Sequence, residues 1–140
     1  MSLPAAWAVQ LALYDTLTTD PGLASVVPQG VRVHDAVPGD PVFPFLTIGE
    51  AKAEDYAGVP GAREHEIRIR AYSRWGGRRE LKTIEHAVTE RLHGGVLSVE
   101  GHRLVSMRLV FADHFRQPDG ETFASVLRFR LVTQPEGTIA

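Results

Sequence analysis

The stretch EHEIRIRAY, residues 64–72, decides the fold class because polar and apolar side chains alternate along it. Successive side chains of a β-strand point to opposite faces of the sheet. One face of this strand would carry His65, Ile67, Ile69 and Ala71, and the other Glu64, Glu66, Arg68 and Arg70. Strict alternation predicts a sheet that has one face in the core and one in water or in a polar interface.

A long hairpin is predicted at the C-terminal end. Residues 103–113 and 122–132 are both strand-like, and Pro118-Asp119-Gly120 between them is a strong turn signal. In the first arm we expect Val105, Met107, Leu109 and Phe111 to share one face. In the second arm the apolar face carries Phe123, Leu127, Phe129 and Leu131, and the opposite face shows Arg128 and Arg130.

Two main helices are predicted. Residues 79–93 place Leu81, Ile84, Val88 and Leu92 in a narrow apolar stripe, and Gly94-Gly95 ends the helix. Residues 4–17 are apolar over more than half of the circumference, with Trp7, Leu11 and Tyr14 aligned. This helix is either buried deep in its own domain or in contact with a neighbouring subunit.

The remaining segments complete an α+β domain. We expect a helical turn at 23–27, short strands at 32–34 and 45–49, a Pro-rich loop at 38–44 and a long mobile connection at 51–62. Helices and strands do not alternate as βαβ units. The order predicts a mostly antiparallel β-sheet with two main α-helices packed on one face and a long C-terminal β-hairpin. Residues 1–133 would form one domain and residues 134–140 a flexible tail.

Composition excludes several classes of protein. The chain has 140 residues, 44% of them hydrophobic, which is ordinary for a folded domain. Its net charge of −2 argues against a general nucleic-acid binder. The absence of cysteine excludes disulfides and thiolate metal sites. We find neither a signal peptide at residues 1–17 nor an apolar run long enough for a membrane span, so no membrane partner is expected.

No constellation of residues favours catalysis. His86, Glu90 and His93 have helical spacing that suits one metal ion, but they lie opposite the apolar stripe. We therefore expect a solvated polar face there. Residues 75–79, WGGRR, could hold an anion before a helix, although a structural turn is the simpler interpretation. We expect no catalytic residue, no metal site and no cofactor.

Arg68, Arg70, Arg128 and Arg130 form the most suggestive feature, because all four point outward from two strands. Glu64 and Glu66 lie among them. The face is either a solvated surface of mixed charge or a polar surface that meets another subunit or lines a passage for DNA. Phosphate contacts of this kind would be independent of base sequence and sensitive to salt.

The order of these landmarks resembles the tail-completion, or tail-terminator, family of long-tailed phages and gene transfer agents. The landmarks are LALYDTL (11–17), RVHDAVP (32–38), FPFLTIGE (43–50), EHEIRI (64–69), YSR (72–74), GR (77–78), PDG (118–120) and RFR (128–130). The resemblance spans residues 6–132. No single motif in it is specific, and the ordered set carries it.

The resemblance implies a structural virion protein and not an enzyme. It implies a hexameric ring that caps the tail tube, stops its polymerisation and offers a docking surface to the head connector. The partners would be copies of the chain, the tube protein and neck proteins, with DNA passing through the ring. The protein would be located at the tail–neck junction of a virion or phage-like particle that is assembled in the bacterial cytoplasm.

By this resemblance, the loops at 38–44 and 51–62 and the hairpin tip near Asp119 would reach tube, connector or neighbouring subunits. Trp7, Tyr14 and the four outward arginines are the other candidate contact residues. The alternatives are another neck component, such as a head-completion or connector subunit, and a small ligand-binding or enzymatic domain.

Overall fold

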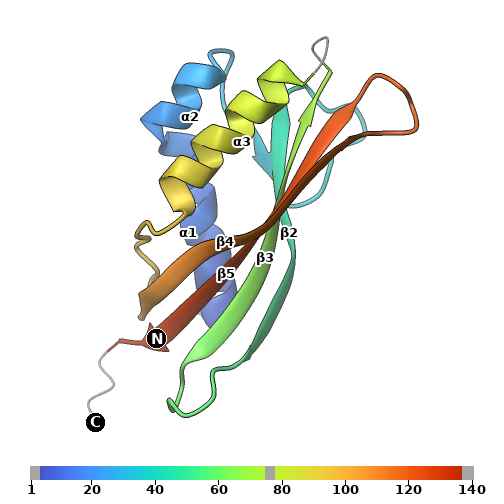
Figure 1. Cartoon of the computed structure of the whole chain (residues 1–140). Helices are drawn as coiled ribbons and strands as arrows, with labels where there is room; N and C mark the ends of the chain where they lie inside the picture. Colours follow the sequence, from blue (N-terminus) through green and yellow to red (C-terminus); the bar gives the residue numbers. More distant parts are fainter. Residues whose placement is uncertain (1–3, 75–77, 137–140) are drawn as a thin grey trace.

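The computed structural model describes residues 4–74 and 78–136, which form a twisted sheet with helices on one face (Figure 1). The helices are α1 (Ala5–Thr19), α2 (Pro21–Val26) and α3 (Arg79–Leu92). The strands are β1 (Val33–His34), β2 (Phe45–Asp55), β3 (Arg63–Ser73), β4 (His102–Arg116) and β5 (Phe123–Pro135). The turn between β2 and β3 and the turn between β4 and β5 lie at opposite ends of the sheet (Figure 1).

The sheet has the strand order β1-β2-β3-β5-β4, so β3 and β5 lie at its centre. Every neighbouring pair is antiparallel except β1 and β2, which run parallel, with Val33 opposite Leu46. The central pair β3–β5 keeps one unbroken register from Arg63 opposite Thr133 to Ser73 opposite Phe123. The predicted α+β class, the mostly antiparallel sheet and the C-terminal hairpin are confirmed.

A single hydrophobic core lies between the helices and one face of the sheet. Ile67 and Ile69 of β3 stand opposite Phe129 and Leu127 of β5 on that face. The helices supply the other half of the core, with Val9, Leu13, Leu17, Leu23, Leu81, Ile84, Val88 and Leu92 all buried. The alternation in residues 64–72 therefore separates core from surface as predicted.

Strand β2 continues to Asp55, so the prediction of a mobile connection from residue 51 is wrong for residues 51–55. Lys52 pairs with Glu66 and Asp55 with Arg63, beyond a register shift after Gly49. These residues have no apolar periodicity of their own. Pairing with β3 makes them a strand, because the neighbouring strand can decide a segment that intrinsic propensity leaves open. The turn proper begins at Tyr56, whose N–H donates to the Ala62 carbonyl at 2.9 Å.

The predicted common face of Val105, Met107, Leu109 and Phe111 is also wrong. Irregularities in the β4–β5 register fall between Leu104 and Ser106 and between Leu109 and Phe111. An extra residue in one strand shifts its side chains to the other face. Met107 is therefore buried, whereas Val105 and Phe111 are 49% and 46% exposed.

The segment around residues 21–27 is a short helix that packs with the two long ones. The carboxylate of Asp20 accepts the N–H of Leu23 at 2.9 Å and caps α2, which begins at Pro21. Leu23 is fully buried. At the other end of the chain, β5 runs to Pro135, and Thr133 is buried. The division into a domain at 1–133 and a flexible tail at 134–140 stays a prediction, and residues 137–140 lie outside the described part.

Phe129 lies at the middle of the core face, where it is 1% exposed. We expect Phe129→Ala to lower the free energy of unfolding by about 3–5 kcal/mol, because it removes a buried ring and leaves a cavity. Urea unfolding followed by circular dichroism measures the loss. Val96→Ala is the control, since Val96 is 76% exposed and such changes stay within about 0.5 kcal/mol. Equal effects of the two changes would contradict the placement of the core.

Candidate interaction surfaces

The face of the sheet opposite the helices carries a ladder of charges along β3 and β5. The Oε1 atom of Glu66 lies 3.2 Å from Nε of Arg128 and 3.9 Å from Nη2 of Arg68. In the same way, the Oε1 atom of Glu64 lies 3.5 Å from Nε of Arg130. Each of these side chains is about one-third to one-half exposed, so each pair contributes about 0–1 kcal/mol to stability.

The charged ladder is an uncovered surface of the described chain, because the helices pack on the other face. On β3 and β5 it places Arg68, Arg70, Arg128 and Arg130 together with Glu64 and Glu66, so cations are in excess on these two strands. On the neighbouring β2, Lys52 and Glu54 continue this face as an ion pair of 2.9 Å. The guanidinium of Arg128 also lies 4.9 Å from the ring centre of Phe111, which the β4 bulge brings to this face. Both predicted interpretations, a solvated surface and a contact surface, remain compatible with this arrangement.

Aromatic rings continue the same face towards the start of β2. Phe45 stacks on Tyr72 with ring centres 4.8 Å apart, and Phe43 meets Phe45 edge-on at 5.0 Å. The guanidinium of Arg74 lies 4.2 Å from the centre of the Phe43 ring. Sequence reasoning missed this cluster. The polar-face position of Tyr72 in the alternating strand was the available signal, since Phe45 is its cross-strand partner.

Asp119 holds the turn of the β4–β5 hairpin. Its Oδ1 atom accepts the N–H groups of Glu121 and Thr122 at 3.0 and 2.8 Å, and its Oδ2 atom accepts the Thr122 hydroxyl at 2.6 Å. Hydrogen bonds from Thr122 and Glu121 lower the pKa of Asp119 to about 2. The carboxylate is thus engaged inside its own chain, and its contact with a partner stays a prediction.

Helix α1 has an apolar stripe on its exposed side as well as a buried one. Trp7, Leu11 and Tyr14 are 47%, 37% and 46% exposed, so the chain itself does not bury them. Together with Val33, His34, Asp35 and Ala36 they line an open groove of about 520 Å³. We call this the α1–β1 groove. Its apolar wall is the second large surface that the fold leaves uncovered.

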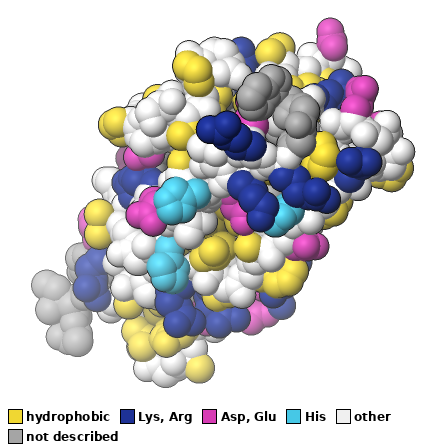
Figure 2. Space-filling view, turned by 45° about the horizontal axis from the view of Figure 1, so that its top comes forward, with side chains coloured by type: hydrophobic (Ala, Val, Ile, Leu, Met, Phe, Trp, Pro, Cys, Tyr) yellow, Lys and Arg dark blue, Asp and Glu magenta, His cyan; other side chains and the backbone are white. Residues whose placement is uncertain are grey.

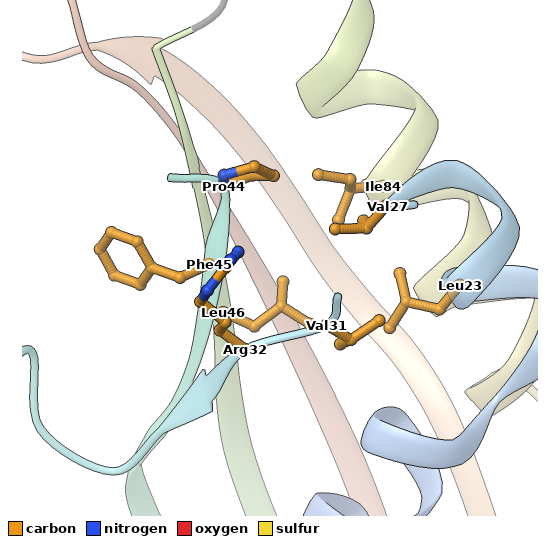
Figure 3. A pocket seen from close by; sticks show the side chains of 8 residues that line it. All are labelled: Leu23, Val27, Val31, Arg32, Pro44, Phe45, Leu46 and Ile84. Atoms are coloured by element: carbon orange, nitrogen blue, oxygen red, sulfur yellow. The ribbon is translucent and has the colours of Figure 1, made fainter. Parts of the chain in front are cut away.

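A small pocket against the core is too small for a ligand. It has a volume of about 10 Å³ and lies between α2, α3 and the start of β2. Figure 3 shows the Leu23 and Ile84 side chains pointing into it from the helices, whereas the Phe45 ring points away. A cavity of this size holds at most one water molecule. The pocket is therefore a packing defect of the core and offers no room for a substrate.

The polar side of α3 does not gather ligands for a metal. His86 Nε2 lies 3.9 Å from Glu90 Oε1, but His93 Nδ1 accepts the N–H of Leu109 in β4 at 3.0 Å. Among the residues that the structure describes, no group of three or more His, Asp or Glu side chains could hold an ion.

Figure 2 shows cationic, acidic, histidine and hydrophobic side chains intermixed on the face that it presents.

Residues 75–77 of the predicted anion loop, which include both of its glycines, lie outside the described residues. Arg78, which follows them, places its guanidinium 5.4 Å from the centre of the Phe123 ring. No helix in the described part of the chain is long and apolar enough to span a membrane.

Residues 11–134 match the family of the tail completion protein gp17. The chain belongs to this family. A solved chain from the virion of a native gene transfer agent particle is 28% identical, with a TM-score of 0.82. The match covers 94% of the present chain and 98% of that chain. Among curated proteins, no sequence matches.

Membership of the tail-completion family confirms the family predicted from the ordered landmarks. The chain is a structural protein of the phage tail or neck, and the predicted place in a virion or phage-like particle is confirmed at this level. The charged ladder and the α1–β1 groove are the two large surfaces that this tail-completion protein leaves uncovered within its described residues.

Buried polar contacts fix α3 on the sheet of the tail-completion fold. The Ser73 hydroxyl donates to Glu80 at 2.7 Å, and the Ser125 hydroxyl donates to Glu85 at 3.1 Å. His114 Nδ1 lies 3.7 Å from the same Glu85 carboxylate. These contacts were not foreseen from the sequence, because serines within an apolar strand face give no sign of their partner. They set the position of α3 and, through it, of the β4 edge.

His65 is the one histidine on the core face of β3. It is 1% exposed, and its Nε2 atom lies 2.9 Å from the Thr133 hydroxyl oxygen. Burial, followed by the nearby Arg63 and His102, lowers the pKa of His65 from 6.5 to about 4. Its neutral form is thus favoured in the folded state, and the stabilisation present above pH 6.5 is lost as the pH falls towards 4.

We expect the free energy of unfolding to fall by up to about 3 kcal/mol over this range because of His65 alone. His65→Gln keeps a hydrogen-bonding group for Thr133 but cannot titrate, so it should flatten this part of the pH profile. Urea unfolding at half-unit pH steps measures the free energy of unfolding as a function of pH. His86→Gln, at an exposed position, is the matched control and should leave the slope unchanged. An equally steep profile in His65→Gln would contradict the assignment.

The lowered pKa of Asp119 makes a separate prediction. The stabilisation is fully present above its ordinary value of 3.8 and is lost as the pH falls through about 2. Asp119→Ala should therefore lower the urea midpoint at pH 7 and match the unmodified chain near pH 2. Asp113→Asn removes a carboxylate from the same hairpin outside the turn and is the control. A pH-independent deficit of Asp119→Ala would disprove the role of its charge.

Proposed function

We propose that this chain is a tail terminator, of which six copies form a ring on the end of the finished tail tube. The ring stops further addition of tube subunits and offers the docking surface for the head connector. The supporting observation is the similarity to a virion chain at a TM-score of 0.82, over 98% of that chain. The two chains are thus alike over their whole length and not in one shared module.

The physical character of the molecule suits an assembly role. The small pocket against the core admits no more than a water, whereas large apolar and charged surfaces remain uncovered. A contact between two different surfaces of the same subunit closes into a ring when its rotation is right, and growth then ends. A terminator needs this finite geometry, because an open-ended contact would itself polymerise.

The shape of the sheet supports two separate docking sides. The β2–β3 turn and the β4–β5 turn extend from opposite ends of the sheet (Figure 1). In a ring of copies, one set of turns faces the tube and the other the connector. The residue 38–44 loop and the turn after Asp55 belong to these contacts in our proposal. DNA passes through the ring without base-specific contacts, and the arginines of the charged ladder line its path.

Deleting the gene in a particle-producing host tests the proposal. We expect headless tails of uncontrolled length in negative-stain electron microscopy, and rescue by the unmodified gene. Native mass spectrometry of the purified chain should give a six-copy species. Tails of normal length that lack heads would instead indicate a component on the head side of the neck. Normal particles would refute the proposal.

An enzymatic role is tested in the same complementation. His86, Glu90 and Arg78 are the exposed polar residues that a catalytic interpretation would use, and we expect the triple alanine variant to rescue the deletion fully. Failure of this variant to rescue, with its fold and ring intact, would favour a catalytic function.

A further inference from the structure

We propose that the chain directly after α3 guards the outer edge of the sheet against pairing with a second copy. His93 and Gly94 occupy hydrogen-bonding groups of β4 that an added strand would otherwise use. We call residues 93–95 the edge guard. The inference concerns the separate subunit, so it does not depend on the proposed ring.

Strand β4 is the edge of the sheet that offers most to another chain. It is the longest of the described strands, with 15 residues, and it pairs with β5 on one side only. An edge strand presents a row of N–H and C=O groups on which another chain can pair and open-ended association can begin. The opposite edge is β1, which has only two residues.

The edge guard binds β4 between the two register shifts of that strand. Gly94 donates its N–H to the Met107 carbonyl at 2.8 Å. The Leu109 N–H, two residues further along β4, donates to Nδ1 of the His93 ring at 3.0 Å. In a parallel ladder, one residue of an added strand donates to a carbonyl and accepts from the N–H two residues further on. The guard therefore fills one such pairing position, and the imidazole nitrogen takes the place of a strand carbonyl.

The backbone after α3 is shaped to bring the guard onto β4. Gly94 has a φ of +70°, which glycine adopts without steric cost and other residues adopt rarely. A Cβ at Gly95 would lie 2.5 Å from the Arg91 carbonyl oxygen, so this position also requires glycine. The Gly95 N–H donates to the Leu92 carbonyl at 3.0 Å. The two glycines therefore do more than end α3, because they also turn the chain against the strand.

Buried residues anchor the guard on both sides. Before it, Leu92 is fully buried, and Glu80 and Glu85 bond α3 to serines of the sheet. After it, Val99 is 4% exposed and forms a bridge with His102 at the start of β4. The guard is thus already in place in the folded subunit. A competing strand has to break both of its bonds to β4 before it can pair there.

The result is a limit on self-association through β4. A second copy that approaches this edge meets a filled position in the middle of the strand, so it cannot pair along the whole length. Association through the faces of the sheet is left unaffected. In a chain that ends a polymer this matters, because a subunit with an open edge would itself start open-ended growth.

Amide hydrogen exchange of Leu109, followed by NMR, tests the contact directly. His93→Ala removes the acceptor, so the Leu109 N–H should exchange about three- to tenfold faster than in the unmodified chain. His93→Asn is the matched control, because its side-chain oxygen can take the place of Nδ1, and it should keep most of the protection. The Phe129 amide, in central strand β5, should exchange equally slowly in all three chains.

Removing the whole guard tests its effect on association. Gly94→Pro deletes the donated N–H, and proline cannot adopt a positive φ, so the chain has to leave β4. Combined with His93→Ala, it should give species whose size grows with protein concentration in analytical ultracentrifugation. The unmodified chain and His86→Ala, at an exposed position of the same helix, should not show this growth.

A single introduced cysteine locates the new contact, because the chain has none of its own. Arg108→Cys places an exposed thiol in the guarded stretch of β4, and Ala24→Cys places one on α2. With the guard removed, a short bismaleimide should link two copies that carry Arg108→Cys. The same thiol should give no link while the guard is intact, and Ala24→Cys should give none in either chain.

Three results would overturn the guard. Unchanged exchange of Leu109 in His93→Ala would show that the contact does not protect the edge. A double variant that is folded by circular dichroism but no larger than the unmodified chain would show that nothing pairs there. Links through Ala24→Cys in place of Arg108→Cys would put the association elsewhere.

Two further points keep the outcome clear. If the double variant does not fold, His93→Ala alone is taken through the same exchange and sedimentation measurements, and it decides the matter. Failure of the guard leaves the terminator function untouched, because the gene deletion tests that function separately.

Discussion

The unbroken pairing of β3 with β5 is the constraint on which the rest of the molecule depends. Its register runs from Arg63 opposite Thr133 to Ser73 opposite Phe123 without a shift. Because side chains alternate across a strand, one fixed register puts Ile67 and Ile69 of β3 and Leu127, Phe129 and Leu131 of β5 together under the helices. It also puts Glu64, Glu66 and the four arginines on the outside. The core and the charged ladder are two consequences of the same hydrogen-bonded pair.

The sequence predicted those elements whose own residues specify them. The alternation of residues 64–72 and the apolar stripe of α3 depend on local periodicity, and both were correct. The extension of β2 to Asp55 and the bulges of β4 depend on a neighbouring strand, so a local pattern could not disclose them. The exposed position of Phe111 follows from one such bulge. For α1, the sequence left burial and subunit contact open, and the structure shows a buried stripe beside an exposed one.

Prediction of the interaction surfaces was limited for a different reason. No short motif marks a surface whose role is contact, and the family was recognised only from the order of many landmarks. Asp119 was singled out as a tip residue, whereas its carboxylate organises the turn itself. The aromatic cluster of Phe43, Phe45 and Tyr72 and the contacts of Glu85 with Ser125 and His114 form only when distant segments meet. Such features belong to the tertiary structure and not to any one segment.

The bonds inside the hairpin turn have a consequence for the energetics of assembly. A loop that becomes ordered only on docking loses conformational entropy at that moment, and the loss weakens binding. Here Asp119, Thr122 and Arg74 hold the turn in one shape in the separate subunit. In the proposed assembly the hairpin would consequently reach its partner preorganised, and little of the free energy of contact would be lost to freezing a flexible arm.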